Sequence, residues 1–348
     1  MTDFRRRTAL GMLGASMAFL AGCSDTSDGT DDGNGTDGGD DASGSDSSLE
    51  GDLPSYASIL PTTDGSSYFY GAIGVETMYT LLQDEGAESG QEPTDPLVGN
   101  PVVVALLAAF GLRLLGSSAG FDAYNGNNET ADGEEQFVYA DGVYALVGSY
   151  DRDALAADLE DAGYTLESEG DAYAVYADDG SDEIVGVTDN VFAYSYPNGS
   201  DSSFDPVAAV ERTVATAAGD RQPKHEADDD FERLLRAGKN GGIACCLYTA
   251  NEQFASETLS NDQASDSEGL QFAFGAFEGA RGVHQHLGVS GGTATAQAVV
   301  TYNTADLVDR ARLKSSLGGD ADADTVAFAR DGSTISVDAK YGGSFATE

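Results

Sequence analysis

The tripeptide His284-Gln285-His286 has a spacing that could bind a transition metal. Alternate side chains of a β-strand point to the same face, so the two imidazoles would lie side by side. His225 is the only other histidine, and further ligands would have to be carboxylates, which occur throughout this acidic chain. We predict that His284 and His286 are solvent-facing strand residues that bind no metal. A metal site is the alternative.

Two short motifs contain possible nucleophiles. Gly288-Val289-Ser290-Gly291-Gly292 has the letters of a hydrolase nucleophile elbow, which requires a strand before the serine, a helix after it and a histidine further along the chain. Strand-like residues follow this motif and no histidine lies beyond His286, so a hairpin turn is predicted. Cys245-Cys246 lies in an apolar strand whose neighbouring residues face opposite sides. This pattern predicts two small buried residues and no disulfide.

An acidic stretch near the C-terminus has part of the spacing of a calcium-binding loop. Asp320, Asp322 and Asp324 fit its first, third and fifth positions. However, Thr325 stands where the turn needs glycine, and Asp331 is shorter than the glutamate expected at the twelfth position. An acidic loop that leads into a hairpin is therefore predicted. From these motifs we assign no catalytic residue and expect no cofactor.

The N-terminal residues carry chemistry of another kind. Arg6-Arg7 precedes a run from Ala9 to Ala21 that is too short to span a bilayer as a helix, which takes about 20 apolar residues. Its length suits the apolar part of a cleavable signal. The run ends at Leu20-Ala21-Gly22-Cys23, where small residues precede a cysteine. We predict a signal peptide over residues 1–22.

These residues resemble two known export sequences. Arg6-Arg7, followed by Thr8-Ala9-Leu10, resembles the twin-arginine motif, whose substrates cross the membrane already folded. Leu20-Ala21-Gly22-Cys23 resembles a lipobox. The second resemblance implies that Cys23 becomes the acylated N-terminus after cleavage. An ordinary signal with a chance cysteine is the alternative.

Residues 23–50 are predicted to form a disordered acidic tether. They are rich in Asp, Gly, Ser and Thr and contain almost nothing apolar, so burial cannot offset the entropy of ordering them. Three acceptor sequences for N-glycosylation occur in loop-like stretches of the chain, as expected for an exported protein. Their asparagines are Asn34, Asn128 and Asn198.

The charge of the chain indicates a saline environment. Acidic residues outnumber basic ones by 60 to 17, which gives a formal net charge of −43. Such a surface repels itself in dilute buffer, whereas in salt near 1 M the Debye length falls to about 3 Å and the charge keeps the protein hydrated. The composition and the signal together resemble the twin-arginine lipoproteins of halophilic archaea. Charge of this sign argues against nucleic acid as a partner.

The body of the chain predicts an α+β fold of mainly antiparallel sheets with helices packed on one face. Hairpins are expected at Asp141-Gly142 and Asp331-Gly332, because glycine accepts a positive φ at little cost. Helices are expected at Asp151–Gly163 and Asp205–Gly219, and the apolar stretch Val102–Leu115 is expected to be a buried helix rather than one on a membrane surface. Further strands are predicted at 67–75, 172–176, 184–188, 191–196, 243–249, 271–277, 283–289 and 295–302, with another helix at 305–317.

The order of elements suggests two related β-rich modules, residues 51–220 and 221–348. A strand, a polar cap, an amphipathic helix and a glycine follow one another in both. Two unrelated α+β stretches are the alternative.

These features predict a membrane-anchored extracellular lipoprotein with a non-catalytic binding or structural role. Its expected partners are the membrane, through a lipid on Cys23, the export machinery, and a protein or small molecule that the sequence does not specify. The first alternative is the solute-binding lipoprotein of an importer, although such proteins have two lobes with mostly parallel sheets. The second is a metal-dependent or hydrolytic surface enzyme.

Overall fold

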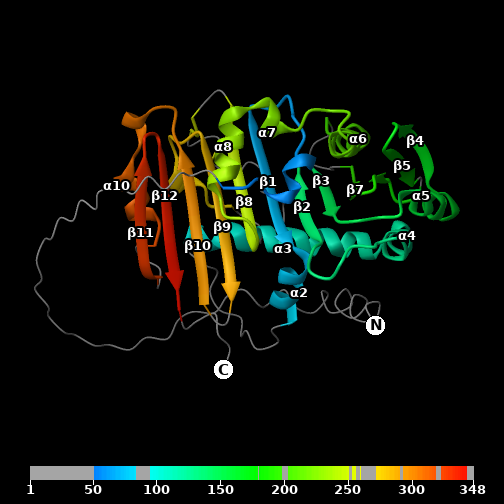
Figure 1. Ribbon diagram of the computed structural model, residues 1–348, viewed down its shortest axis with the longest axis horizontal. Coiled ribbons are helices and arrows are strands. Elements are labelled where there is room, and N and C mark those ends of the chain that lie inside the picture. The colour runs from blue at the N-terminus through cyan, green and yellow to red at the C-terminus, as the bar shows by residue number, and fades with distance from the viewer. Residues whose placement is uncertain are drawn as a thin grey trace, which may run out of the picture.

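The described part of the chain forms one antiparallel sheet of twelve strands with helices on both faces (Figure 1). The computed structural model describes residues 51–83, 95–178, 180–197, 203–250, 253–255, 259, 272–290, 293–318 and 323–342. The strand order is β11-β12-β10-β9-β8-β1-β2-β3-β7-β6-β5-β4. The predicted α+β class and mainly antiparallel pairing are confirmed, but the helices pack on both faces of the sheet and not on one face as predicted.

The elements have the following bounds. The strands are β1 (Ser67–Gly74), β2 (Gln136–Ala140), β3 (Val143–Val147), β4 (Thr165–Glu169), β5 (Ala174–Asp178), β6 (Glu183–Val187), β7 (Val191–Ser195), β8 (Ile243–Thr249), β9 (Gly282–Ser290), β10 (Thr293–Thr301), β11 (Ala323–Asp331) and β12 (Thr334–Tyr341). The helices are η1 (Ser55–Ile59), α2 (Val75–Gln83), α3 (Pro96–Gly116), α4 (Gly120–Gly126), α5 (Arg152–Asp161), α6 (Pro206–Ala217), α7 (Lys224–Ala227), α8 (Asp229–Ala237), η2 (Gly275–Phe277), η3 (Ala305–Leu307) and α10 (Arg310–Ser316).

Strand β1 joins the two predicted modules at the centre of the sheet. It pairs with β2 on one side, where Tyr70 lies opposite Ala140, and with β8 on the other, where Tyr70 lies opposite Cys246. The strands of 51–220 and 221–348 therefore belong to one continuous sheet, and each of the two buried cores contains residues from both ranges.

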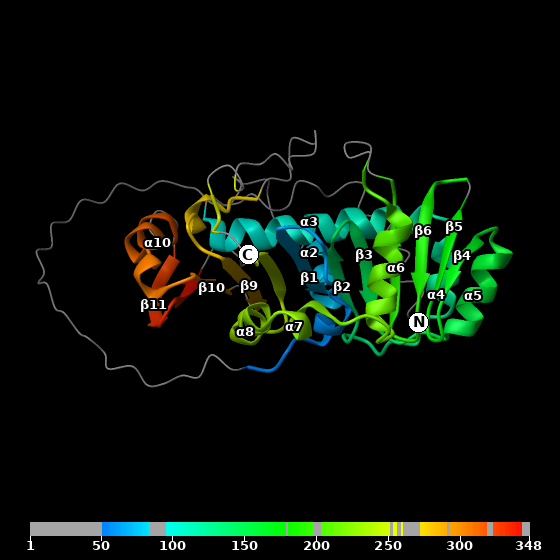
Figure 2. The ribbon, with the colours of Figure 1, turned by 90° about the horizontal axis from the view of Figure 1, so that it is seen from above.

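The two cores lie on opposite faces of the sheet. Side chains from α2, α3, α4, α5 and α10 pack in the first core, and side chains from η1, α6 and α8 pack in the second. Because alternate strand residues face opposite sides, Ile73 of β1 belongs to the first core and Tyr68 and Tyr70 belong to the second. Figure 2 shows α3 on one side of the sheet and α7 and α8 on the other.

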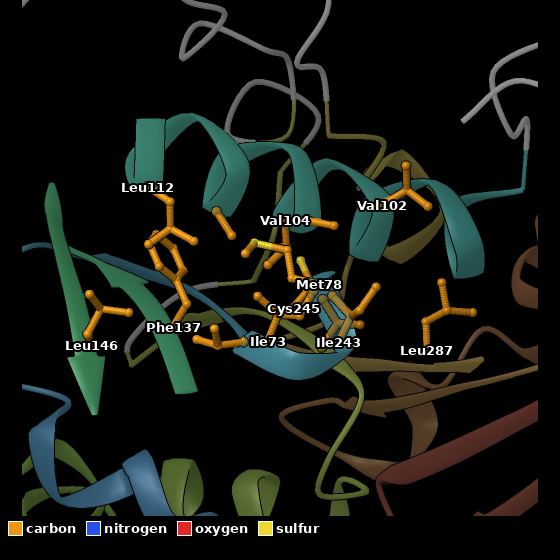
Figure 3. Close-up of a cluster of buried hydrophobic side chains, with 14 of the residues drawn as sticks. Ile73, Met78, Val102, Val104, Leu112, Phe137, Leu146, Ile243, Cys245 and Leu287 are labelled. Carbon is orange, nitrogen blue, oxygen red and sulfur yellow. The ribbon is translucent and has the colours of Figure 1, made fainter. Parts of the chain in front are cut away.

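Helix α3 covers the middle of the first face. Asp95 caps it by accepting a hydrogen bond from the Leu97 amide, and Pro96 occupies the first turn, so the helix begins six residues before the predicted start at Val102. It is the one helix of the described residues with the length and composition to cross a membrane, but 61% of that stretch is buried in the fold. Val104 and Leu112 lie over the sheet (Figure 3), which confirms the prediction of a buried helix.

Two glycines allow α3 to approach the strands closely. A Cβ atom on Gly71 of β1 would lie 2.7 Å from Cγ1 of Val104, and one on Gly111 of α3 would lie 2.7 Å from the ring of Tyr144. Real Cβ atoms do not come this near to other atoms, so alanine at either position would push the helix away from the sheet.

Several local predictions are confirmed. The β2–β3 hairpin turns at Asp141 and Gly142, whose φ angles are 50° and 78°. Asp151 caps α5 by accepting a hydrogen bond from the Ala154 amide. Ser290 ends β9 and the chain continues into β10, as the hairpin interpretation of the serine motif requires.

Three local predictions differ from the structure. Within the range 271–277, where a strand was predicted, the structure has η2; Phe277 is fully buried there, and the rings of Phe272 and Phe274 stack on each other. The helix predicted at 305–317 is divided into η3 and α10, because Asp309 caps a new helix by accepting a hydrogen bond from the Arg312 amide. Strand β4 was not predicted, since its residues are mostly exposed and lack apolar alternation.

Candidate functional site: a basic pocket beside α6

The two strand histidines are buried, so the prediction that they face solvent is wrong. His284 is 1% exposed and His286 is 7% exposed. Gly238, the C-cap of α8, covers His284 so closely that a Cβ atom there would lie 2.3 Å from Nδ1. Burial lowers the pKa of His284 to about 3. Both imidazoles are therefore neutral at pH 7.

The surroundings of these histidines do not form a metal centre. Cys246 lies opposite His284 in the sheet, and the ring of Tyr70 is 6.3 Å from the His284 ring. Burial raises the pKa of the Cys246 thiol, which keeps it protonated. Among the described residues, no three His, Cys, Asp or Glu side chains gather where they could hold an ion.

The two cysteines are free, as predicted. Both are fully buried, and they face opposite sides of β8: Cys245 packs in the first core and Cys246 in the second. They act as small apolar residues in the middle of the sheet.

Most of the other predicted site residues lie outside the described residues. These are Arg6, Arg7, Leu20, Ala21, Gly22, Cys23, Asn34 and Asn198. Their roles stay predictions, as does the calcium-like spacing at Asp320 and Asp322, which also lies outside.

Asn128 is described, and its side chain is held by three hydrogen bonds. Its amide nitrogen donates to Oε1 of Glu135 at 2.6 Å and to the Tyr124 hydroxyl at 3.2 Å. Its oxygen accepts from the Thr130 amide at 2.9 Å, and the Thr130 hydroxyl accepts from the Ser149 amide at 2.8 Å. A glycan on Asn128 would require these contacts to break, and its modification stays a prediction.

A cavity of about 250 Å³ lies between α6 and the segments that flank it. Asp205 caps α6 by accepting a hydrogen bond from the Ala208 amide, and Pro206 begins the helix. After the helix, Gly219 adopts a φ of 83°, which turns the chain back along α6. The cavity is lined by Thr62, Arg212, Thr216, Arg221 and Gln222.

Hydrogen bonds hold the wall of this pocket in place. The Arg221 amide donates to the carbonyl of Ala215 at 3.2 Å, which fixes the turn that follows α6. The Thr62 hydroxyl donates to the Gln222 carbonyl at 3.4 Å, and the Thr216 hydroxyl donates to the Arg212 carbonyl at 2.7 Å. The segment after η1 and the segment after α6 thus form one wall.

Arg212 is incompletely paired. Its Nη2 lies 3.5 Å from Oδ2 of Asp141, and its buried Nε donates no hydrogen bond within the described residues. Burial raises the pKa of Asp141 even though the Arg212 charge opposes that shift. The Arg212 guanidinium is therefore only partly paired by Asp141.

Lys224 follows the pocket and is enclosed by aromatic rings. Its Nζ lies 4.8 Å from the ring centre of Tyr68, 5.3 Å from that of Phe231 and 5.4 Å from that of Tyr248. Desolvation lowers the pKa of Lys224, and the Asp228 carboxylate opposes this effect. The ammonium anchors α7 by cation–π contacts.

The pocket lies in a part of the chain that is comparatively rich in basic residues. Six of the fourteen lysines and arginines after Cys23 lie between 206 and 239, where seven acidic residues accompany them. The sequence analysis did not identify this pocket, because its basic residues follow no known motif. The available signal was this density of basic residues in a chain of net charge −43.

No family model and no curated protein sequence matches the chain. Among solved structures, crystal form I of TP0453 has a TM-score of 0.38 and 9% identity, and the match covers 82% of this chain and 92% of that chain. Crystal form III of TP0453 has a TM-score of 0.37 and 10% identity, with 85% and 95% covered. At these TM-scores the likeness supports no inference about function.

Proposed function

We propose that the chain is a membrane-anchored extracellular lipoprotein whose folded body has a non-catalytic binding role. The order of Arg6-Arg7, the apolar run, Cys23 and the acidic tract supports the anchor. The observation that carries the binding role is the pocket beside α6, where two arginines line a cavity in a strongly acidic chain.

The side chains of the pocket are suited to binding. Two arginines, two threonines and a glutamine line it. A guanidinium stays protonated at all accessible pH values, and hydroxyl and amide groups do not titrate near neutrality. Such a wall offers many hydrogen-bond donors but no acid or base of its own. A solute-binding subunit of an importer stays an alternative within this proposal.

The anchor is tested by replacing Cys23 with serine. The substitution removes the thiol that would form the thioether, so the protein should remain uncleaved or appear in the medium instead of as a processed membrane form. Two acyl chains would contribute about 0.8 kcal/mol for each buried methylene, which makes the wild-type attachment durable. Cell fractionation and intact-protein mass spectrometry report both outcomes.

A matched pair of export variants separates the anchor from the signal. Replacing Arg6 and Arg7 with lysines should block export and leave folded precursor inside the cell, whereas Cys23→Ser should leave export possible. If the Cys23→Ser protein fractionates and migrates like wild type, Cys23 is a chance cysteine and the anchored function is refuted.

A further inference from the structure

The pocket beside α6 contains two arginines that the fold leaves with few partners. Most other arginines of the described body bond to an acid or a carbonyl: Arg152 with Asp153, Arg233 and Arg281 with Asp230, Arg236 with Glu232, Arg312 with Glu278, and Arg330 with Ala305 and Gly332. Arg212 has only the 3.5 Å approach to Asp141, and the Arg221 side chain makes no hydrogen bond or ion pair with the described residues. Arg113 and Arg310 have no such partner in the described body either, but they do not line this cavity.

Both arginines belong to segments that the fold holds in place. Arg212 is in α6, whose Val210 and Val214 pack in the second core. Arg221 follows the turn that the Ala215 carbonyl holds by accepting from two backbone amides. Its neighbour Gln222 accepts from the Thr62 hydroxyl through its carbonyl. The two arginines therefore line one cavity from two anchored segments.

Resting on the binding role proposed above, we propose that this pocket binds a tetrahedral oxyanion group of phosphate or sulfate size. A guanidinium can offer parallel N–H donors to two oxygens of such a group, and two guanidinium groups match its double charge. A carboxylate would satisfy one arginine, and chloride offers no directional acceptors.

The acidic neighbours of the pocket weaken binding but do not prevent it. Asp141 competes for Arg212, and Asp220 adjoins Arg221 in the sequence. In molar salt, where the Debye length is about 3 Å, the long-range repulsion of a net charge of −43 is screened. Contacts of hydrogen-bond length then decide whether the anion binds.

The test uses the processed full-length protein in detergent and molar sodium chloride. Inorganic phosphate is titrated and followed by phosphorus NMR, and sulfate and acetate are titrated as competitors at constant ionic strength. Arg221→Gln removes one guanidinium from the exposed side of the pocket. Arg233→Gln, on α8 with a side chain 73% exposed, is the matched control. Wild type and the control should bind phosphate saturably, sulfate should displace it, and Arg221→Gln should weaken binding about 10-fold to 100-fold.

Three results would overturn the proposal: binding that does not saturate, equal binding by Arg221→Gln and Arg233→Gln, or displacement by acetate as effective as by sulfate. If Arg221→Gln fails to fold, phosphate binding is measured with Arg212→Gln, which should weaken it as well. The outcome is independent of the fractionation of the Cys23→Ser protein. A surface lipoprotein that binds no oxyanion is thereby distinguished from a protein that is not anchored.

Discussion

The two halves of the sheet bury their titratable groups in different ways. In the β1–β7 half, Glu135 and Glu183 are buried and receive hydrogen bonds from tyrosine hydroxyls. In the β8–β12 half, His284 and His286 are buried as neutral rings, and no described group bonds to their Nδ1 atoms. The two halves belong to one sheet, but one buries hydrogen-bonded carboxyl groups and the other buries neutral imidazoles.

The carboxylates are held by donors that carry no positive charge. Oε1 of Glu135 accepts from Tyr124 at 2.8 Å, Asn128 at 2.6 Å and Tyr150 at 3.2 Å. Oε1 of Glu183 accepts from Tyr196 at 2.6 Å, and its other oxygen accepts from Tyr164. After Cys23 the chain has 14 lysines and arginines and 16 tyrosines, so tyrosine hydroxyls outnumber cations in this part of the chain. Neutral donors thus replace salt bridges inside an acidic protein.

The imidazoles need no charged partner, because burial itself keeps them neutral. The consequence is an opposite response to pH. Burial raises the pKa of Glu183, although the bonds from Tyr164, Tyr196 and Ser118 oppose this shift. Burial lowers the pKa of His284 to about 3. A fall in pH therefore stabilises the native β1–β7 half through Glu183 and destabilises the native β8–β12 half through His284.

Low salt should produce the largest difference between regions of the sheet. Strands β4 and β5 lie within residues 151–183, which have twelve acidic residues and one basic residue. Strands β11 and β12 lie within residues 305–341, which have seven acidic residues and five basic residues. Lowering the salt from molar to about 0.1 M lengthens the Debye screening from about 3 Å to about 10 Å and exposes this repulsion. Hydrogen exchange should show β4 and β5 losing protection before β11 and β12, with unfolding of the body to follow. An unchanged melting temperature would contradict the halophilic interpretation.

Removal of a buried acceptor should have the next largest effect. Glu135→Ala leaves the hydroxyls of Tyr124 and Tyr150 and the amide of Asn128 without their shared acceptor, so the free energy of unfolding should fall by about 3 kcal/mol. The neighbouring exposed residue provides the control, and Glu134→Ala should change stability by less than about 0.5 kcal/mol. Denaturant unfolding in molar salt measures both. Equal losses would mean that the cluster around Glu135 contributes nothing.

A change of pH should move the two halves in opposite directions. The folded pKa of His284 lies below its usual 6.5, so its contribution to stability is present above pH 6.5 and is lost as the pH falls toward 3, by at most about 1.4 kcal/mol per pH unit. The folded pKa of Glu183 is raised, so its contribution is greatest at acid pH and is lost as the pH rises through that pKa.

Hydrogen exchange at pH 7 and pH 5, corrected for the intrinsic rates, reports the two halves separately. Amides of β9 should lose protection at pH 5, and those of β6 should gain it. In His284→Leu the acid sensitivity of β9 should diminish while β6 still responds. Parallel changes in β6 and β9 would show that general charge, and not these two groups, controls the response.

The smallest expected effect concerns Asn128. Asn128→Ala removes one donor from Glu135 but leaves both tyrosines, so the loss should be about 1 kcal/mol, less than for Glu135→Ala. If export occurs after folding, Asn128 should also carry no glycan, since its amide is already bonded. Peptide mass spectrometry of the secreted protein measures the occupancy. A glycan at Asn128 would indicate that the chain met the transferase before it folded.

Features that depend on a few neighbouring residues were predictable from the sequence. The turn at Asp141-Gly142 and the caps Asp151 and Asp205 are as predicted, because backbone sterics and one side chain decide them. Strand 283–289 was also placed correctly, but the side that its histidines face depends on what covers the sheet. Nothing near His284 in the sequence indicates that α8 and Gly238 lie above it.

The sequence by itself determined the turns, the caps, the class of fold and the acidic character of the surface, since these follow from local sterics and composition. The tertiary structure alone decided which groups meet. Tyr341 donates to Asp95 across 246 positions of the chain, Asn100 of α3 donates to Gln285 of β9, and Arg212 and Arg221 line one pocket. Such contacts depend on strand order and register, which arise when the two cores pack on both faces of one sheet.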